Sequence, residues 1–188
     1  EIYTLSLHDA LPIFGVMIAS EDPAAFVTTL RDVFNSEPFD DFNYKPEFDM
    51  LGRSYSIGYE PDLEFTLIKR PQKNLTDPRN QWVVWYPLMR AKKFYVLPEE
   101  KQKSILGEHG TLAKRYGAGG HATDIRLACH GLDRDDNDFV VGLLGPNLHP
   151  LSAVVQEMRR TEQTSQYLDR LGPFFIGKAI WQSAYDDA

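Results

Sequence analysis

The pattern of apolar and polar positions is most regular in the second half of the chain. Apolar residues recur at helical spacing over about 97–116 and again over about 149–167, so both stretches predict amphipathic helices. Apolar runs of strand length accompany them, at 81–88, 122–129, 138–145 and 173–180. The order strand, helix, strand, strand, helix, strand is that of the ferredoxin-like arrangement, in which two helices cover one face of an antiparallel sheet.

The first half carries shorter elements. We expect a strand at 14–19, a helix beginning near Pro23, strands at 52–58 and 63–69, and a linker at 70–79, where two prolines fall. This order resembles part of a second ferredoxin-like unit. The predicted fold class is therefore α+β with two ferredoxin-like (βαββαβ) halves and antiparallel sheets. The N-terminal half, at 14–80, is predicted to be truncated, and the C-terminal half covers 81–188.

Two polar residues interrupt the apolar stripes of the predicted helices. His109 lies among Ile105, Leu112 and Tyr116, and Glu162 extends the stripe of the second helix by one turn. A buried carboxylate is costly unless it is paired, so one explanation covers both residues. The imidazole would ligate a metal while Glu162 holds its second nitrogen. The alternative is a satisfied core histidine and a glutamate at the end of a helix.

Composition narrows the class of protein. The 188 residues are 43% hydrophobic and 12% aromatic, which is enough for a folded core. A net charge of −7 argues against nucleic-acid binding, and no apolar run approaches the roughly 20 residues that would span a bilayer. We therefore expect a cytoplasmic protein that acts without a membrane or nucleic-acid partner.

Cysteine usage excludes some metal chemistry. Cys129 is the only cysteine, so neither an intramolecular disulfide nor a thiolate zinc cage can form. His121, Cys129 and His130 suggest a second metal site. Strand geometry argues against that site, because adjacent residues such as Cys129 and His130 point to opposite faces of a strand.

The first residues need separate treatment. The string EIYTLSLHDALPI, residues 1–13, resembles the translated read-through of a sequencing adapter. We exclude it from the fold prediction as a non-native segment, and we expect the native N-terminus to be missing.

Five strings in order carry a family resemblance: WYPLMR, EHGTLAKRYG, HGLDRDDNDF, EMRRTEQ and GPFFIG. Together they resemble the chlorite dismutase superfamily, which includes the coproheme decarboxylases and other haem-binding proteins. The resemblance is good over about 86–180 and loose before it. It implies haem b or iron coproporphyrin bound in the C-terminal half, and a homo-oligomer, often a pentamer.

The resemblance also implies roles for particular residues. His109 matches the proximal iron ligand, and Glu162 matches the glutamate that accepts a hydrogen bond from its other nitrogen. Tyr86 matches the tyrosine that coproheme decarboxylases use as a radical relay to the propionate being cleaved. A tyrosine before a proline at a strand end is also common as a simple rim residue.

Other matched positions concern binding of the porphyrin. Arg90 matches a basic residue that pairs with a propionate, and Lys92 or Lys93 could assist it, although lysines in such a loop are often only solvated. Phe94 stands where many relatives have a tryptophan beneath the haem. The apolar contact is retained there, whereas the indole hydrogen bond is lost.

The resemblance also implies a distal residue, which would act on the side of the haem opposite His109 and lie on the strand after the helix of His109. Which residue it is depends on the motif from which the sequences are aligned. It falls on Ala122, Asp124 or Arg126, which share one face of the predicted strand. We favour Arg126, which would stabilise an anionic oxygen ligand of the iron. A structural arginine paired with Asp124 or Asp133 is the alternative.

These assignments favour a haem-dependent oxidoreductase that resembles coproheme decarboxylase and uses peroxide. A chlorite dismutase or haem peroxidase is an alternative, with chlorite or peroxide as oxidant. A second alternative is a non-catalytic haem-binding or haem-transfer protein. A third alternative is a ferredoxin-like oligomerisation module without a cofactor.

Overall fold

The structure is a computed structural model that describes residues 14–58 and 60–184. Its elements in chain order are η1 (Pro23–Phe26), α1 (Thr29–Phe34), η2 (Pro46–Phe48), η3 (Phe65–Lys69), α2 (Arg70–Thr76), β1 (Trp82–Arg90), α3 (Lys92–Tyr95), α4 (Glu99–Ala118), β2 (Thr123–Ala128), β3 (Phe139–Gly145), α5 (Leu148–Met158), α6 (Glu162–Gln166), β4 (Leu168–Leu171) and β5 (Phe175–Lys178). The expected adapter-derived segment, 1–13, lies outside the described residues. Within them, no helix has the length and apolar character needed to cross a membrane.

The sheet has the ferredoxin-like strand order β2-β3-β1-β4, and neighbouring strands in this order run antiparallel. β4 pairs with the end of β1, and β5 pairs with its beginning, Trp82 to Trp85. The two short strands thus form the fourth strand together, interrupted at Gly172, whose φ of 97° favours glycine. The predicted α+β class and antiparallel sheet are confirmed.

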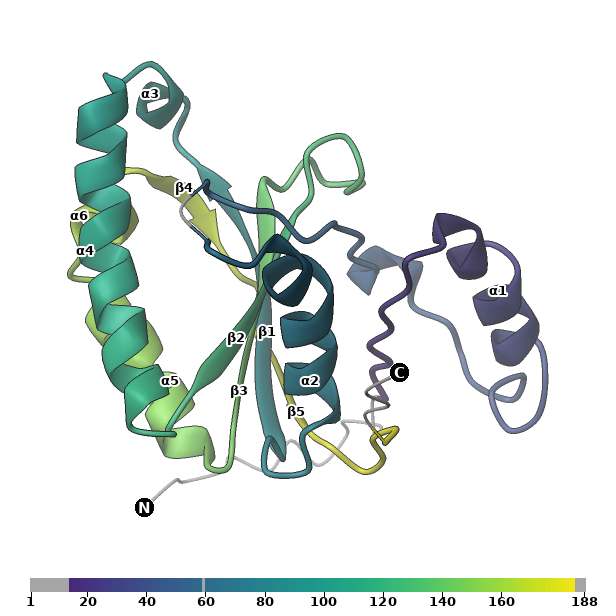
Figure 1. The fold of residues 1–188 in the computed structure, drawn as a ribbon. Helices are drawn as coiled ribbons and strands as arrows, with labels where there is room; N and C mark the ends of the chain where they lie inside the picture. The colour runs from purple at the N-terminus through teal and green to yellow at the C-terminus, as the bar shows by residue number, and fades with distance from the viewer. Residues whose placement is uncertain (1–13, 59, 185–188) are drawn as a thin grey trace, which may run out of the picture.

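The core lies between the sheet and the helices that follow β1 and β3. Side chains alternate along β1, so Val84, Tyr86 and Leu88 share one face, and they pack with Phe139 of β3 and Leu151 of α5. In Figure 1, α4 and α5 stand on this side of the sheet, whereas α2 lies away from α4. We call this side the helical face.

α4 forms the outer wall of the helical face. Glu99 and Glu100 occupy its first turn, where carboxylates favour the helix dipole, and Gly120 follows its end with a positive φ. Along its length α4 packs mainly against α5 and α6. The Tyr116 hydroxyl donates a 2.5 Å hydrogen bond to Glu157 of α5, which ties the two helices together.

The second predicted helix is shorter than expected. α5 ends at Met158, and a new helix, α6, begins after Thr161, whose side chain caps it by accepting from the Thr164 N–H. The predicted continuation through residue 167 was wrong because the helix ends at Met158 and the Thr161 cap starts a separate one. The β4 strand after it was not predicted.

The strands expected in the first half were also wrong. Residues 14–19 have no regular structure, and 63–69 are helical and run into α2, where a linker was expected. Asp62 accepts from the Phe65 N–H and so starts a helix in a short apolar run that periodicity alone cannot assign. Among the described residues before β1, only Arg53 forms a β-bridge to the sheet, with Ala128 on the outer edge of β2. The domain boundary at residue 80 stays a prediction.

Candidate functional site

His109 lies on α4 and is partly buried, on the helix side that also carries the buried Ile105. Burial, together with the positive charges of Arg126 and Arg90, lowers the pKa of its imidazole to about 4. The ring is therefore neutral at pH 7, which leaves one nitrogen lone pair free to bind a metal. Its Nδ1 lies 3.5 Å from the Thr161 hydroxyl oxygen.

Strand register places the catalytic candidates on the helical face of the sheet, the side that α4 and its His109 cover. Tyr86 pairs with Val141, which pairs in turn with Arg126, so all three side chains project from the helical face. Asp124 stands one step along β2 on the same face. The structure thus brings together residues that lie far apart in the sequence.

Arg126 and Asp124, the two candidates for the distal position, are bonded to each other. Arg126 Nε lies 2.8 Å from Asp124 Oδ2, and Asp124 also pairs with Arg70 of α2. The Arg126 side chain is still 44% exposed, so its guanidinium is held without being enclosed. Ala122, the third alignment alternative, is buried in the core before β2 begins.

Tyr86 is only 9% exposed and packs its ring against Phe174 at a centroid distance of 4.8 Å. Burial raises the pKa of its phenol well above the usual range, and the charge of Asp124 acts in the same direction. Tyr86 is consequently a protonated phenol at any physiological pH.

Arg90 has an unusual environment for a cation. Its guanidinium carbon lies 4.8 Å from the centre of the Phe94 ring and 4.4 Å from that of Phe139. Its Nε is buried with no hydrogen-bond partner among the described residues. A buried guanidinium N–H without an acceptor is costly, so this position fits a bound anion such as a carboxylate. Phe94, 1% exposed, forms the floor beneath it.

Glu162 does not hydrogen-bond His109, contrary to the expectation from the sequence. Its carboxylate lies 2.7 Å from Lys101 Nζ, and its own backbone N–H donates to Glu108. The break before α6 explains the difference, because Glu162 starts a new helix and no longer continues the stripe of α5. Lys92 is exposed at the beginning of α3, and Lys93 lies 5.2 Å from the Tyr167 ring.

Tyr55 was missed by the sequence reasoning. Its ring packs against Phe139 at 5.3 Å, and burial raises its pKa while the charges of Arg126 and Arg90 oppose that rise. The Arg53–Ala128 bridge brings it to this face. Its only sequence signal was the apolar alternation of 52–58, which says nothing of where that segment docks.

The alternative metal site at His121, Cys129 and His130 is not formed. Among residues 14–58 and 60–184, no three His, Cys, Asp or Glu side chains gather to hold a metal ion. His130 Nδ1 instead lies 3.3 Å from Asp138, and burial raises the pKa of the Cys129 thiol to about 11. His109 would thus be a single protein ligand, which suits an iron already held by a porphyrin.

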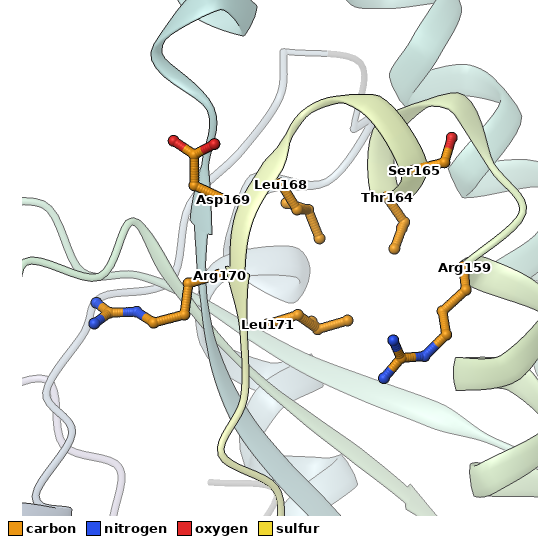
Figure 2. Close-up of a pocket in the computed structure, with 7 residues that line it drawn as sticks. All are labelled: Arg159, Thr164, Ser165, Leu168, Asp169, Arg170 and Leu171. Carbon is orange, nitrogen blue, oxygen red and sulfur yellow. The ribbon is translucent and has the colours of Figure 1, made fainter.

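A shallow cavity of about 310 Å³ lies elsewhere, between α6 and β4. In Figure 2, Arg159 and Leu171 point toward its centre, whereas Arg170 and Asp169 point away. Its walls contain none of the predicted site residues.

Comparison with known proteins gives a consistent set of relatives. The family model described as chlorite dismutase matches residues 57–180. The coproheme decarboxylase of Mycolicibacterium smegmatis is 27% identical over 126 residues, which are 66% of this chain and 52% of that protein. The chain therefore spans about half the length of this curated relative.

Solved structures include a haem-binding protein from Thermus thermophilus, 28% identical with a TM-score of 0.49 over 54% of this chain and 40% of that one. A variant of chlorite dismutase from Candidatus Nitrospira defluvii is 17% identical, with a TM-score of 0.49 over 63% and 50%.

Proposed function

Because the chain belongs to the chlorite dismutase family, we propose that it is a haem-dependent oxidoreductase that decarboxylates propionates of iron coproporphyrin with peroxide. The observation that carries the proposal is the partly buried, neutral imidazole of His109, which is close enough to Arg90 and Arg126 for their charges to act on it; Arg126 shares its face of the sheet with Tyr86. A neutral ligand with positive charge opposite it suits an anionic iron porphyrin.

The chain's own residues would bind and orient the porphyrin. His109 would ligate the iron through its ring nitrogen, and the unpartnered Nε of Arg90 would donate to a propionate carboxylate. The Phe94 ring packs against the Arg90 guanidinium, and the exposed Lys92 would assist with a second carboxylate. The Glu162 carboxylate is held in an ion pair with Lys101.

Each turnover would convert one propionate, one peroxide and one proton into a vinyl group, carbon dioxide and two waters. An iron porphyrin bound here would supply the oxidising equivalents from its reaction with peroxide. Tyr86 would relay one hydrogen, as proton plus electron, from the propionate through its Oη, which burial keeps protonated. Arg126, held by Asp124, would favour negative charge on the oxidant.

Mass spectrometry of the porphyrin tests this reaction. Purified protein incubated with iron coproporphyrin and peroxide should yield products that have lost one and then two formic-acid equivalents. Tyr86→Phe should bind the same porphyrin and leave its mass unchanged. A parent protein that leaves the mass unchanged rejects the decarboxylase proposal.

A second candidate is chlorite dismutation or peroxidase activity, supported by Arg126 in the same cross-strand row as Tyr86. An oxygen electrode separates the two reactions, because only a chlorite dismutase releases oxygen from chlorite. A haem-binding or haem-transfer protein without turnover is the remaining alternative. It predicts a haem Soret band but no reaction with either oxidant.

We also infer a homo-oligomer in the cytoplasm, as the family resemblance implies. Exposed apolar side chains near the C-terminal end of the described chain, Ile176, Ile180 and Trp181, support a contact with another copy. Light scattering after size-exclusion chromatography measures this directly, and a monomer at micromolar concentration would contradict it.

A further inference from the structure

Thr161 is the polar group that lies against the second nitrogen of His109. Its side-chain oxygen is 3.5 Å from Nδ1, and the residue is only 5% exposed. The contact is long for a hydrogen bond, and its direction depends on which ring nitrogen of His109 carries the proton. The other bonds of the Thr161 hydroxyl bear on that direction.

A threonine hydroxyl has one proton to donate and two lone pairs to accept with. Thr161 donates that proton to the Met158 carbonyl oxygen at 2.8 Å, and one of its lone pairs accepts from the Thr164 backbone N–H at 3.4 Å. Toward His109 the hydroxyl therefore offers only a lone pair. A ring proton on Nδ1 would donate to this remaining lone pair, and the free lone pair of the ring would then be on Nε2.

The nearby carboxylates are engaged elsewhere. Glu162 is held by Lys101, and Glu108 accepts the backbone N–H of Glu162. The other neutral acceptor on this turn is Gln163, whose buried Oε1 has no partner among the described residues. The polar neighbour of Nδ1 is thus uncharged.

We propose that Thr161, rather than Glu162, is the positioning residue that holds His109 in its Nδ1–H tautomer with Nε2 ready for iron. This deepens the proposed function and rests on it for the role of the iron. A neutral acceptor draws the Nδ1 proton less strongly than a carboxylate does. The imidazole is then a weaker donor, and the iron should have a higher reduction potential than with a carboxylate partner.

The tautomer can be measured without any porphyrin. Two-dimensional ¹H–¹⁵N NMR of histidine side chains in the apo protein at pH 7.5, assigned with His109→Gln, should show His109 mainly as Nδ1–H. Free histidine in water prefers Nε2–H, so the expected result is an inversion. A parent protein with mainly Nε2–H would overturn the proposal whether or not any variant folds.

Variants then identify the acceptor. Thr161→Val, which keeps the shape but removes the hydroxyl, should shift His109 toward Nε2–H and weaken haem binding about tenfold, whereas Thr161→Ser should behave as the parent. Glu162→Gln, Gln163→Met and the neighbouring Thr164→Val should leave the tautomer unchanged. A shift in Glu162→Gln or Gln163→Met, with none in Thr161→Val, assigns the role elsewhere and refutes the proposal.

The two proposals fail in different ways. If the apo protein has the Thr161-dependent tautomer but its spectrum does not change with haem or coproheme, the proposed function fails and the assignment to Thr161 stands. If haem binds through His109 and Thr161→Val changes neither the tautomer nor the affinity, only the assignment to Thr161 fails.

Discussion

Two walls of the candidate site differ in charge: the helical wall, which carries His109 and Thr161, and the sheet wall, which carries Arg90 and Arg126. On the helical wall, His109 is neutral and its polar neighbour Thr161 is a hydroxyl, while the carboxylates of Glu108 and Glu162 are engaged elsewhere. On the sheet wall, the positive charges of Arg90 and Arg126 act on His109, and Arg126 is paired with Asp124. Ligation and charge recognition are thus divided between the walls, so each can be altered alone.

Removing the helical wall's ligand should have the largest effect. His109→Ala is expected to weaken haem and coproheme binding by about 100-fold or more, because it removes the single protein ligand to the iron. A spectrophotometric titration of the Soret band measures this loss. Circular dichroism provides the control for folding, and unchanged affinity in a folded variant would mean that His109 is only a core residue.

On the sheet wall, Tyr86→Phe should separate turnover from binding. We expect decarboxylation to fall about 100- to 10,000-fold, because the relay hydrogen on Oη is lost, with coproheme affinity within about threefold of the parent. Single-turnover mass spectrometry follows the reaction. Equal rates in parent and variant would leave Tyr86 as an amphipathic rim residue.

Arg90→Leu should weaken coproheme binding by about 10- to 100-fold, since a charge-assisted hydrogen bond contributes about 1.5–3 kcal/mol. Lys92→Ala is the matched control, because Lys92 is exposed and its loss should weaken binding by less than about threefold. Fluorescence quenching by coproheme measures both variants. A larger loss in Lys92→Ala than in Arg90→Leu would reverse the assignment.

The helical wall also predicts a dependence of stability on pH. The pKa of His109 is about 4 in the folded protein and about 6.5 when unfolded, so the unfolded chain binds a proton more readily between these values. The contribution of the neutral His109 imidazole to the free energy of unfolding is fully present above pH 6.5. It is lost as the pH falls toward 4, by at most about 3 kcal/mol. The difference between urea unfolding of the parent and of His109→Gln across this range isolates the effect. Parallel curves would show that the imidazole is not buried.

The sequence predicted those parts of the molecule that depend on local periodicity. Helical spacing placed His109 inward, and the alternation of apolar runs predicted the strands that now carry Tyr86 and Arg126. The ferredoxin-like order followed from the order of these elements. The resemblance between motifs then connected His109 to iron, which periodicity alone leaves open.

What could not be predicted depends on where helices stop and on contacts across the chain. The Thr161 cap between α5 and α6 redirects Glu162 to Lys101, and no spacing rule distinguishes that break from a continuous helix. Tyr55 reaches the site through the bridge from Arg53 to Ala128, which lies on a strand much later in the sequence. The run at 63–69 became helical because Asp62 caps it.

The central claim is that His109 ligates iron opposite a cationic sheet wall. Resonance Raman spectroscopy of the reduced, haem-loaded protein tests it most directly through the iron–imidazole stretching band. We expect a band that shifts when histidines are ¹⁵N-labelled, disappears in His109→Gly and returns when free imidazole is added. A band that persists in His109→Gly without imidazole, or that never forms in the haem-loaded parent, would contradict the claim.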